Sequence, residues 1–207
     1  MAARPAAGGG RWVDVAPERL PRWLENFAAR HGGYTADGLH LVAADGATAD
    51  LEPPPGASGV RTVDDLRTAR CRLGLLLARK GAVAAGIADG DRLVSSKVDT
   101  HYVQGRTAAG GWSQQRFARR RDNQARAAAA DGAAIAERVL LPEVRTMAAL
   151  VCGGDRTAVD AILAVPALAP LAALRADRLL DVPEPRHAVL VTAVAQARAI
   201  RILVRDP

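Results

Sequence analysis

The sequence predicts an α/β (α+β) fold: a mixed β-sheet with helices packed on it, preceded by a small αββ unit. The first observation is a set of three apolar runs of strand length between residues 70 and 103, separated by tight turns. Such runs are typical of an antiparallel meander. The second observation is the alternation of helical and strand patterns after residue 113, which indicates a sheet covered by helices.

The composition favours a polyanionic partner. The chain has 207 residues, enough for one good-sized core or for a small domain attached to a medium one, and a formal net charge of +6. Nearly all of the positive charge is arginine, since Lys80 and Lys97 are the only lysines. The planar guanidinium of arginine suits phosphate. A GC-rich genome, which inflates alanine, glycine and arginine together, accounts for the same composition equally well.

The cysteines, histidines and apolar segments argue against a disulfide-stabilised, a metal-binding and a membrane protein. Cys71 and Cys152 stand far apart in apolar runs, so we expect buried free thiols in a reducing cytosol. The four histidines show no metal-ligand spacing with each other or with the cysteines, and no metal or cofactor is predicted. No segment approaches the length of a membrane span, and the N-terminus lacks the apolar stretch of a signal peptide. We therefore expect a soluble, cytoplasmic protein without a membrane partner.

The N-terminal part is expected to hold one amphipathic helix and one hairpin. Residues 1–15 are rich in alanine, glycine and proline, and we expect disorder there. The αββ unit is expected over residues 16–58. Its helix, over residues 17–30, presents one apolar face, made of Leu20, Trp23, Leu24 and Phe27. Two short alternating runs with Asp-Gly turn signals follow, and a Pro- and Gly-rich linker at 53–59 ends the unit.

Residues 59–207 are expected to form the second, larger domain. A capped turn at residues 62–65 precedes the meander, and a long helix should run from Ser113 to about Leu141. A buried strand, a helix with Asp155 as its N-cap, and a closing strand, helix and strand complete the domain. The turn in "CGGDRT" lacks the Gly-Lys-Ser/Thr of a phosphate-binding loop, so a plain strand-to-helix turn is favoured there.

One segment, "GRTAAGGWSQQRFARRRDNQAR" at residues 105–126, is unlike ordinary globular sequence. It holds five arginines within eleven positions, and Asp122 is the only nearby acid. On a helical wheel one third of the circumference holds Arg116, Arg119, Arg120, Asn123 and Arg126, whereas Phe117, Ala128 and Ile135 lie on a side expected to pack on the sheet. Cations without local acids favour a phosphate backbone as partner, and a merely solvated basic face is the alternative.

The loop at residues 104–115 combines a glycine tip with two amides. Gly110 and Gly111 either let backbone N–H groups approach a ligand closely or simply provide a turn that needs positive φ. Gln114 and Gln115 begin the helix, where backbone N–H groups have no internal partner. A neutral amide is not a strong general base. It can orient water and hydrogen-bond to an oxyanion or a leaving oxygen, which is enough for hydrolysis of an activated ester held in place.

The stretch "GGWSQQRFARRRDN" resembles the catalytic loop and following helix of the class-1 peptide-chain release factors of eukaryotes and archaea. Those factors carry Gly-Gly-Gln followed by a Ser-x-x-Arg-Phe-Ala-Arg run. Gly110 and Gly111, Ser113 and residues 116–119 stand in the same register. The resemblance covers roughly residues 70 to 207 and implies a fold like the central domain of those factors. The chain has no room for their stop-codon-reading domain.

One position departs from that pattern. Trp112 stands where release factors have their glutamine, and glutamines follow two and three positions later. In this respect the chain resembles the Vms-like release-factor family, and among its members most of all the bacterial, actinobacterial-type ones. That resemblance implies a peptidyl-tRNA hydrolase of ribosome rescue and ribosome-associated quality control, which frees nascent chains on stalled large ribosomal subunits without reading a codon. The implied partners are the large subunit, peptidyl-tRNA and ribosomal RNA, and we expect a monomer.

The resemblance also implies roles for individual residues. Gln114, directly after Ser113, would position the attacking water or support the leaving oxygen, with Gln115 as the other candidate. Gly110 and Gly111 would let the loop enter the peptidyl-transferase centre. The arginines expected to contact RNA phosphates, largely without base specificity, are Arg106, Arg116, Arg119, Arg120 and Arg126.

Other functions stay open at this point. A non-catalytic ribosome- or RNA-binding protein would keep the domain without hydrolysis, with Trp112 plugging the place of the amide or stacking there. A plain RNA-binding module of unrelated ancestry is a further alternative. The N-terminal αββ unit carries no chemical signal, and it either docks on the ribosome or packs against the second domain.

Overall fold

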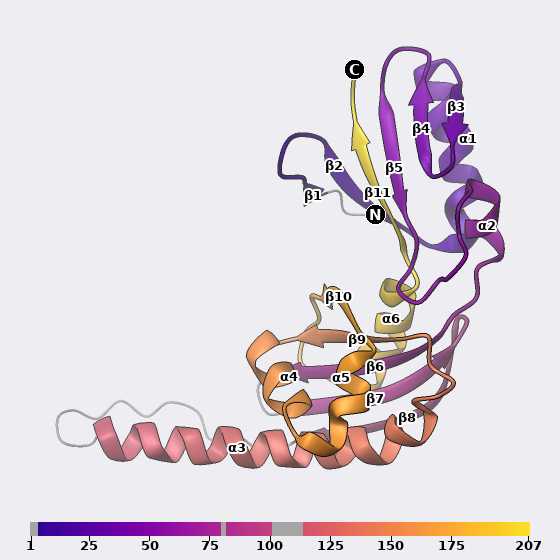
Figure 1. Ribbon diagram of the computed structural model, residues 1–207. Coiled ribbons are helices and arrows are strands. Elements are labelled where there is room, and N and C mark those ends of the chain that lie inside the picture. The colour runs from indigo at the N-terminus through magenta and orange to yellow at the C-terminus, as the bar shows by residue number, and fades with distance from the viewer. Residues whose placement is uncertain (1–3, 80–81, 101–113) are drawn as a thin grey trace. The chain divides into compact units, whose positions relative to one another are not determined.

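The computed structural model describes residues 4–79, 82–100 and 114–207, without the side chains of residues 100 and 114–123 (Figure 1). The chain divides into two compact units. Unit 1 comprises Met1–Cys71 and Ala195–Pro207, and unit 2 comprises Arg72–Val194. The chain therefore leaves unit 1 once and returns to it near its C-terminus.

Unit 1 is a six-stranded antiparallel sheet with the order β1-β2-β11-β5-β4-β3. The strands are β1 (Arg4–Pro5), β2 (Arg11–Val15), β3 (Tyr34–Asp37), β4 (His40–Ala43), β5 (Thr48–Glu52) and β11 (Ile200–Arg205). The short helix η1 (Pro17–Arg19) leads into α1 (Leu20–His31), which packs on one face of this sheet. The core between them includes Val15, Leu20, Leu24, Phe27, Leu41, Leu51, Ile200, Ile202 and Val204.

Glycines and a side-chain cap end or start the elements of unit 1. Gly32 adopts φ +75° at the C-cap of α1, a left-handed conformation that glycine takes without steric cost. Gly38 adopts φ +62° in the turn between β3 and β4. A capping box between Thr62 and Asp65 starts α2 (Val63–Thr68), as the sequence predicts.

The structure corrects three expectations for this part of the chain. Residues 4–5 and 11–15 are strands rather than a disordered segment, because β2 pairs with β11 and contributes Val15 to the core. The segment after α1 forms three strands rather than two, since each Asp-Gly turn joins its own pair. The last strand lies in the sheet of unit 1, so the observed division differs from the boundaries 16–58 and 59–207.

Unit 2 is a mixed sheet with helices on both faces, which confirms the predicted fold class. Its strands, in the order β10-β9-β6-β7-β8, are β6 (Arg72–Arg79), β7 (Ala82–Asp89), β8 (Arg92–Thr100), β9 (Ala149–Gly154) and β10 (Arg175–Leu180). β6, β7 and β8 form the predicted antiparallel meander. β9 runs parallel to both β6 and β10.

Helices cover the two faces of this sheet unequally. One face is covered by α3 (Gln114–Val139), α4 (Arg156–Leu163) and α5 (Ala169–Ala173), with the 3-10 turns η3 (Leu141–Glu143) and η4 (Pro166–Leu168). α6 (His187–Ala197) covers the other face. A Cβ at Gly86 of β7 would lie 2.9 Å from Cδ2 of Leu190, so glycine lets α6 approach the sheet closely.

Two further expectations concern thiols and membrane spans. Cys152 is buried in β9 and Cys71 is half-buried, and both are free thiols.

In the described ranges no single helix is both long and apolar enough to cross a membrane. One bent pair of helices, Arg156–Leu163 with Pro166–Ala173, meets the length and composition limits when taken together.

Candidate functional site

The C-terminal half of α3 is embedded in the core of unit 2. Its buried side chains are Ala133, Ile135 and Ala136, and Leu140, directly after the helix, is buried with them. Gly132 makes the close packing possible: a Cβ there would lie 2.6 Å from Cδ1 of Ile162 in α4 and 3.2 Å from Cγ2 of Val83 in β7. Glycine within a helix costs about 1 kcal/mol relative to alanine, and here that cost is offset by contact between α3, α4 and the sheet.

The N-terminal half of α3 extends past the end of the sheet (Figure 1). Gly132 packs on Val83 of β7. The neighbouring Ala82 pairs with Arg79 of β6 and with Thr100 of β8, and these are the last residue pairs of the meander. Residues 124–127 are all exposed. At about 1.5 Å per residue, the helix from Gly132 back to Gln114 is about 27 Å long. The start of α3 therefore lies well beyond the edge of the sheet.

β8 leads the chain to the same edge. It is antiparallel to β7, which is antiparallel to β6, so β8 runs parallel to β6 and β9. Its last residue, Thr100, therefore lies where the parallel strands have their carboxyl ends. In α/β sheets ligands bind outside this edge. Residues 101–113, which connect β8 to α3 in the sequence, lie outside the described residues.

The structure describes part of the predicted site. The helix begins within one residue of its predicted start, and its first two turns hold Gln114, Gln115, Arg116, Arg119 and Arg120, whose side chains lie outside the described residues. Arg126 is exposed on the projecting half of α3. Ile135 packs in the core as expected. The remaining predicted residues, all outside the described ranges, are Arg106, Gly110, Gly111, Trp112 and Ser113.

The glycine turn after β9 lies at the same edge and is structural. The Asp155 carboxylate accepts hydrogen bonds from the N–H groups of Thr157 (2.9 Å) and Ala158 (3.4 Å) at the start of α4. Hydrogen bonds, first from the Thr157 side chain, lower the pKa of Asp155. Because this carboxylate already occupies the helix N-terminus that a phosphate would need, the turn is the plain strand-to-helix turn that the sequence predicts.

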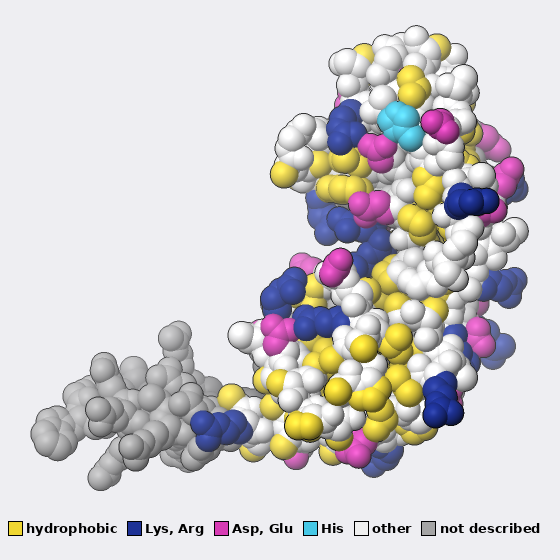
Figure 2. All heavy atoms as spheres, in the orientation of Figure 1, with side chains coloured by type: hydrophobic (Ala, Val, Ile, Leu, Met, Phe, Trp, Pro, Cys, Tyr) yellow, Lys and Arg dark blue, Asp and Glu magenta, His cyan; other side chains and the backbone are white. Residues whose placement is uncertain are grey.

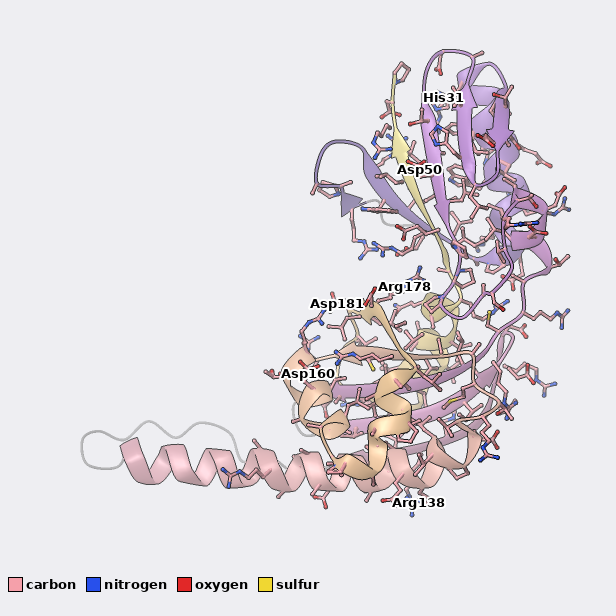
Figure 3. All side chains as sticks on the ribbon, in the orientation of Figure 1. His31, Asp50, Arg138, Asp160, Arg178 and Asp181 are labelled. Atoms are coloured by element: carbon pink, nitrogen blue, oxygen red, sulfur yellow. The ribbon has the colours of Figure 1, made fainter. Side chains whose placement is uncertain are left out.

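Two further arginines of unit 2 are paired locally. Arg79 donates a hydrogen bond to the Val182 carbonyl (2.6 Å) and lies 3.5 Å from Asp181. Arg175 pairs with Asp160 at 2.6 Å. Figure 3 shows Asp160 and Asp181 on one side of unit 2. These cations are therefore already neutralised within unit 2.

The net charge of the chain is concentrated around the loop and the start of α3. Outside residues 80–81 and 100–123, unit 2 carries eleven basic and eleven acidic side chains, and unit 1 carries eleven basic and ten acidic ones. Figure 2 shows side chains of both signs interspersed on the face in view. Most of the +6 net charge thus belongs to Lys80 and to the five arginines of residues 100–123. A genome-wide bias in composition would raise the arginine content throughout the chain, so it does not explain why the net positive charge is confined to this segment.

The histidines of unit 1 have structural partners. Nδ1 of the buried His31 lies 2.8 Å from Asp45, and His40 pairs with Asp50. No three His, Cys, Asp or Glu side chains are grouped to hold a metal ion anywhere in the described part of the chain.

The comparison with protein families assigns the chain. A family model described as the Actinobacteria/chloroflexi VLRF1 release factor matches residues 71–203. The chain belongs to this release-factor family. The assignment confirms the resemblance to the Vms-like release-factor family and supports a role in translation termination or ribosome rescue. No curated protein matches the chain.

Solved structures resemble the chain over part of its length. The crystal structure of the archaeal translation termination factor aRF1 is 17% identical, with a TM-score of 0.43, and the match covers 61% of this chain and 34% of that chain. A second structure, described as an archaeal protein, is 16% identical with a TM-score of 0.42, covering 67% of this chain and 40% of that chain. This chain therefore spans about a third of the length of the archaeal factor that it matches.

Proposed function

We propose that this VLRF1 protein is a peptidyl-tRNA hydrolase that releases nascent chains from tRNA on stalled large ribosomal subunits without reading a codon. One observation carries the proposal: Gln114 and Gln115 begin a helix that extends past its sheet and carries five arginines within eleven positions, with Asp122 as the only acid near them in the sequence. Family membership supports the ribosome as the place of action. Cytoplasmic location follows from that place of action.

The reaction is attack of water on the ester between the nascent peptide and the 3′ ribose of tRNA. The water oxygen bonds to the ester carbonyl carbon, the bond from that carbon to the ribose oxygen breaks, and the ribose oxygen receives a proton. Gln114 hydrogen-bonds the water or the leaving oxygen, with Gln115 as the other candidate. The first N–H groups of α3 lack helical partners and give this end of the helix a partial positive charge, which favours a developing oxyanion.

The arginines supply binding rather than chemistry. Arg116, Arg119, Arg120 and Arg126 follow the glutamines on the same helix, and Arg106 precedes the glycine tip in sequence. Guanidinium groups contact phosphates of ribosomal RNA or tRNA without reading bases, which suits a factor that acts independently of a codon. Gly110 and Gly111 keep side chains off the tip, and a monomer is sufficient for this arrangement.

The test is release of labelled peptide from peptidyl-tRNA on isolated large subunits, with wild type, Gln114→Ala and Gln115→Ala compared. Gln124→Ala is the matched control, because Gln124 is exposed on the same helix. Loss of one oriented hydrogen-bond donor lowers the rate of such reactions about 100- to 1000-fold. We expect that loss in one of the two amide variants, with subunit binding unchanged, and wild-type release by the control.

Trp112 favours one other function. It occupies the position at which release factors carry glutamine, so a non-catalytic ribosome-binding protein is the second candidate. In that case wild type binds subunits in a salt-sensitive manner and releases no peptide. Release by wild type that is retained in both amide variants would also contradict the proposed mechanism.

A further inference from the structure

The outward side of α1 in unit 1 carries a row of cations. Arg22, Asn26 and Arg30 are spaced four residues apart and are exposed, so they lie on one stripe of the helix. Arg19, also exposed, continues the row in the turn before α1. We call these four residues the α1 stripe. It runs along the whole helix, about 16 Å from Arg19 to Arg30 at about 1.5 Å per residue.

The α1 stripe faces away from the core, because the opposite side of the helix is buried against the sheet. Leu20, Leu24 and Phe27 are buried against the sheet, and His31 is buried with them. Trp23 lies between the two sides, half-buried and stacked on Phe27 with 5.3 Å between ring centroids. The outward row of arginines is therefore bordered by an aromatic ring.

Ion pairs distinguish the arginines of this stripe from six of the eight other arginines of unit 1; Arg61 and Arg70 are the two others without an ion pair within 4 Å in the described residues. Six arginines pair with carboxylates in the same unit, namely Arg4, Arg11, Arg67, Arg198, Arg201 and Arg205. In the described part of the chain, Arg19, Arg22 and Arg30 form no ion pair within 4 Å. Glu18, beside Arg19, is itself paired with Arg198 at 2.6 Å, and Glu25 is the one acid on the outer side of α1.

We propose that the α1 stripe binds the phosphate backbone of RNA and so gives unit 1 a contact of its own with the substrate complex. Charge complementarity supports this occupant, because three guanidinium groups without carboxylate partners stand in a row that a phosphate chain can follow. The border formed by Trp23 lets an unpaired base stack beside the row. The contact is independent of sequence, as for other phosphate-directed arginines.

This inference rests on the proposed place of action but not on hydrolysis. The test uses the full-length protein and measures its affinity for isolated large ribosomal subunits, and separately for deacylated tRNA, over a range of salt concentrations. The variant is Arg22→Gln/Arg30→Gln. The matched control is Arg4→Gln/Arg67→Gln, which removes the same charge from the same unit at two exposed, paired arginines. Thermal unfolding of each variant checks that the fold is kept.

Each phosphate contact contributes about 0.7 to 0.9 to the slope of log affinity against log salt. We expect the α1 variant to lower that slope by about 1.4 to 1.8 and the affinity at 0.1 M salt by about tenfold, with the control close to wild type. Loss on subunits alone identifies ribosomal RNA as the source of the phosphates, and loss on tRNA identifies tRNA. Glu25→Gln should tighten binding.

Equal slopes for the α1 variant and its control would overturn the inference, as would absence of binding by wild type to both RNAs. Neither result bears on hydrolysis, because the amide variants at the start of α3 test that step through peptide release. Conversely, a wild type that binds through the α1 stripe and releases no peptide would keep this inference while the proposed reaction fails.

Discussion

Gly132 of α3 lies directly against Ile162 of α4, so close that a Cβ on Gly132 would stand 2.6 Å from Cδ1 of Ile162. This contact fixes where α3 crosses the sheet. Because the helix is continuous from Gln114 to Val139, the same contact fixes the position of its projecting end. The packing of a small residue in the core thus bears on a site about 27 Å away along the helix.

Gly132→Ala should destabilise unit 2 in spite of alanine's better helix propensity. Overpacking costs about 1 to 3 kcal/mol, against a gain of about 1 kcal/mol from propensity. Ile162→Val removes the methyl group that the new Cβ meets, at a cost of about 1 kcal/mol on its own. Chemical unfolding of both single variants and the double variant should give a double variant more stable than the sum of its parts by at least about 0.5 kcal/mol. Strict additivity would contradict the contact.

The two thiols should differ in reactivity. Burial raises the pKa of Cys152 to about 11 and also raises the pKa of Cys71, which is only half-buried. At pH 8 about one Cys152 in a thousand is then a thiolate, the reactive form. Alkylation followed by mass spectrometry should modify Cys71 slowly, and Cys152 only in denaturant or as pH rises toward 11. Rapid modification of native Cys71→Ser protein at pH 8 would show that Cys152 is accessible.

Local patterns in the sequence predict most of unit 2. The meander, the long helix and the capped turn at Asp155 each follow from residues close together in the chain, such as the Asp89-Gly90 turn and the Asp155 N-cap. The organisation of unit 1 depends on distant residues. β11 has the alternation of a strand, yet nothing local says that it pairs with β2 and β5, whose residues lie far before it.

The candidate site divides in the same way. The residue types around Gln114 predict a helix start and a phosphate-binding surface, because both depend on local order. The contact of Gly132 with Ile162 and Val83 depends on three separate elements. In the sequence, Gly132 stands out only as a residue of low helix propensity. In the fold, the close packing of α3 on α4 and the sheet depends on it. The unpaired arginines on the outer side of α1 can be recognised only from the ion pairs that the folded unit 1 forms.

Because β11 lies between β2 and β5 in the sheet of unit 1, we expect the stability of unit 1 to depend on this C-terminal strand. Ile202 is fully buried between β2 and β5. Ile202→Ala should cost about 2 to 5 kcal/mol. In a Trp112→Phe background the fluorescence of Trp12 and Trp23 reports unit 1 alone, and its unfolding midpoint in denaturant should fall. Val42→Ala, at a valine 42% exposed in β4, should change stability by less than about 0.5 kcal/mol. An unchanged midpoint for Ile202→Ala would contradict the pairing.

Two arginines of α3 provide a matched test of the projecting half of the helix. Arg126 and Arg138 are both exposed, but Arg126 lies on the part beyond the sheet and Arg138 lies in the last turns, beside the core (Figure 3). If phosphates are bound by the projecting half, Arg126→Gln should lower the slope of log affinity against log salt for large subunits by about 0.7 to 0.9. Arg138→Gln removes the same charge from the same helix and should leave the slope unchanged. Equal effects of the two variants would mean that the protein responds only to its overall charge, and the assignment of RNA contact to the start of α3 would then be wrong.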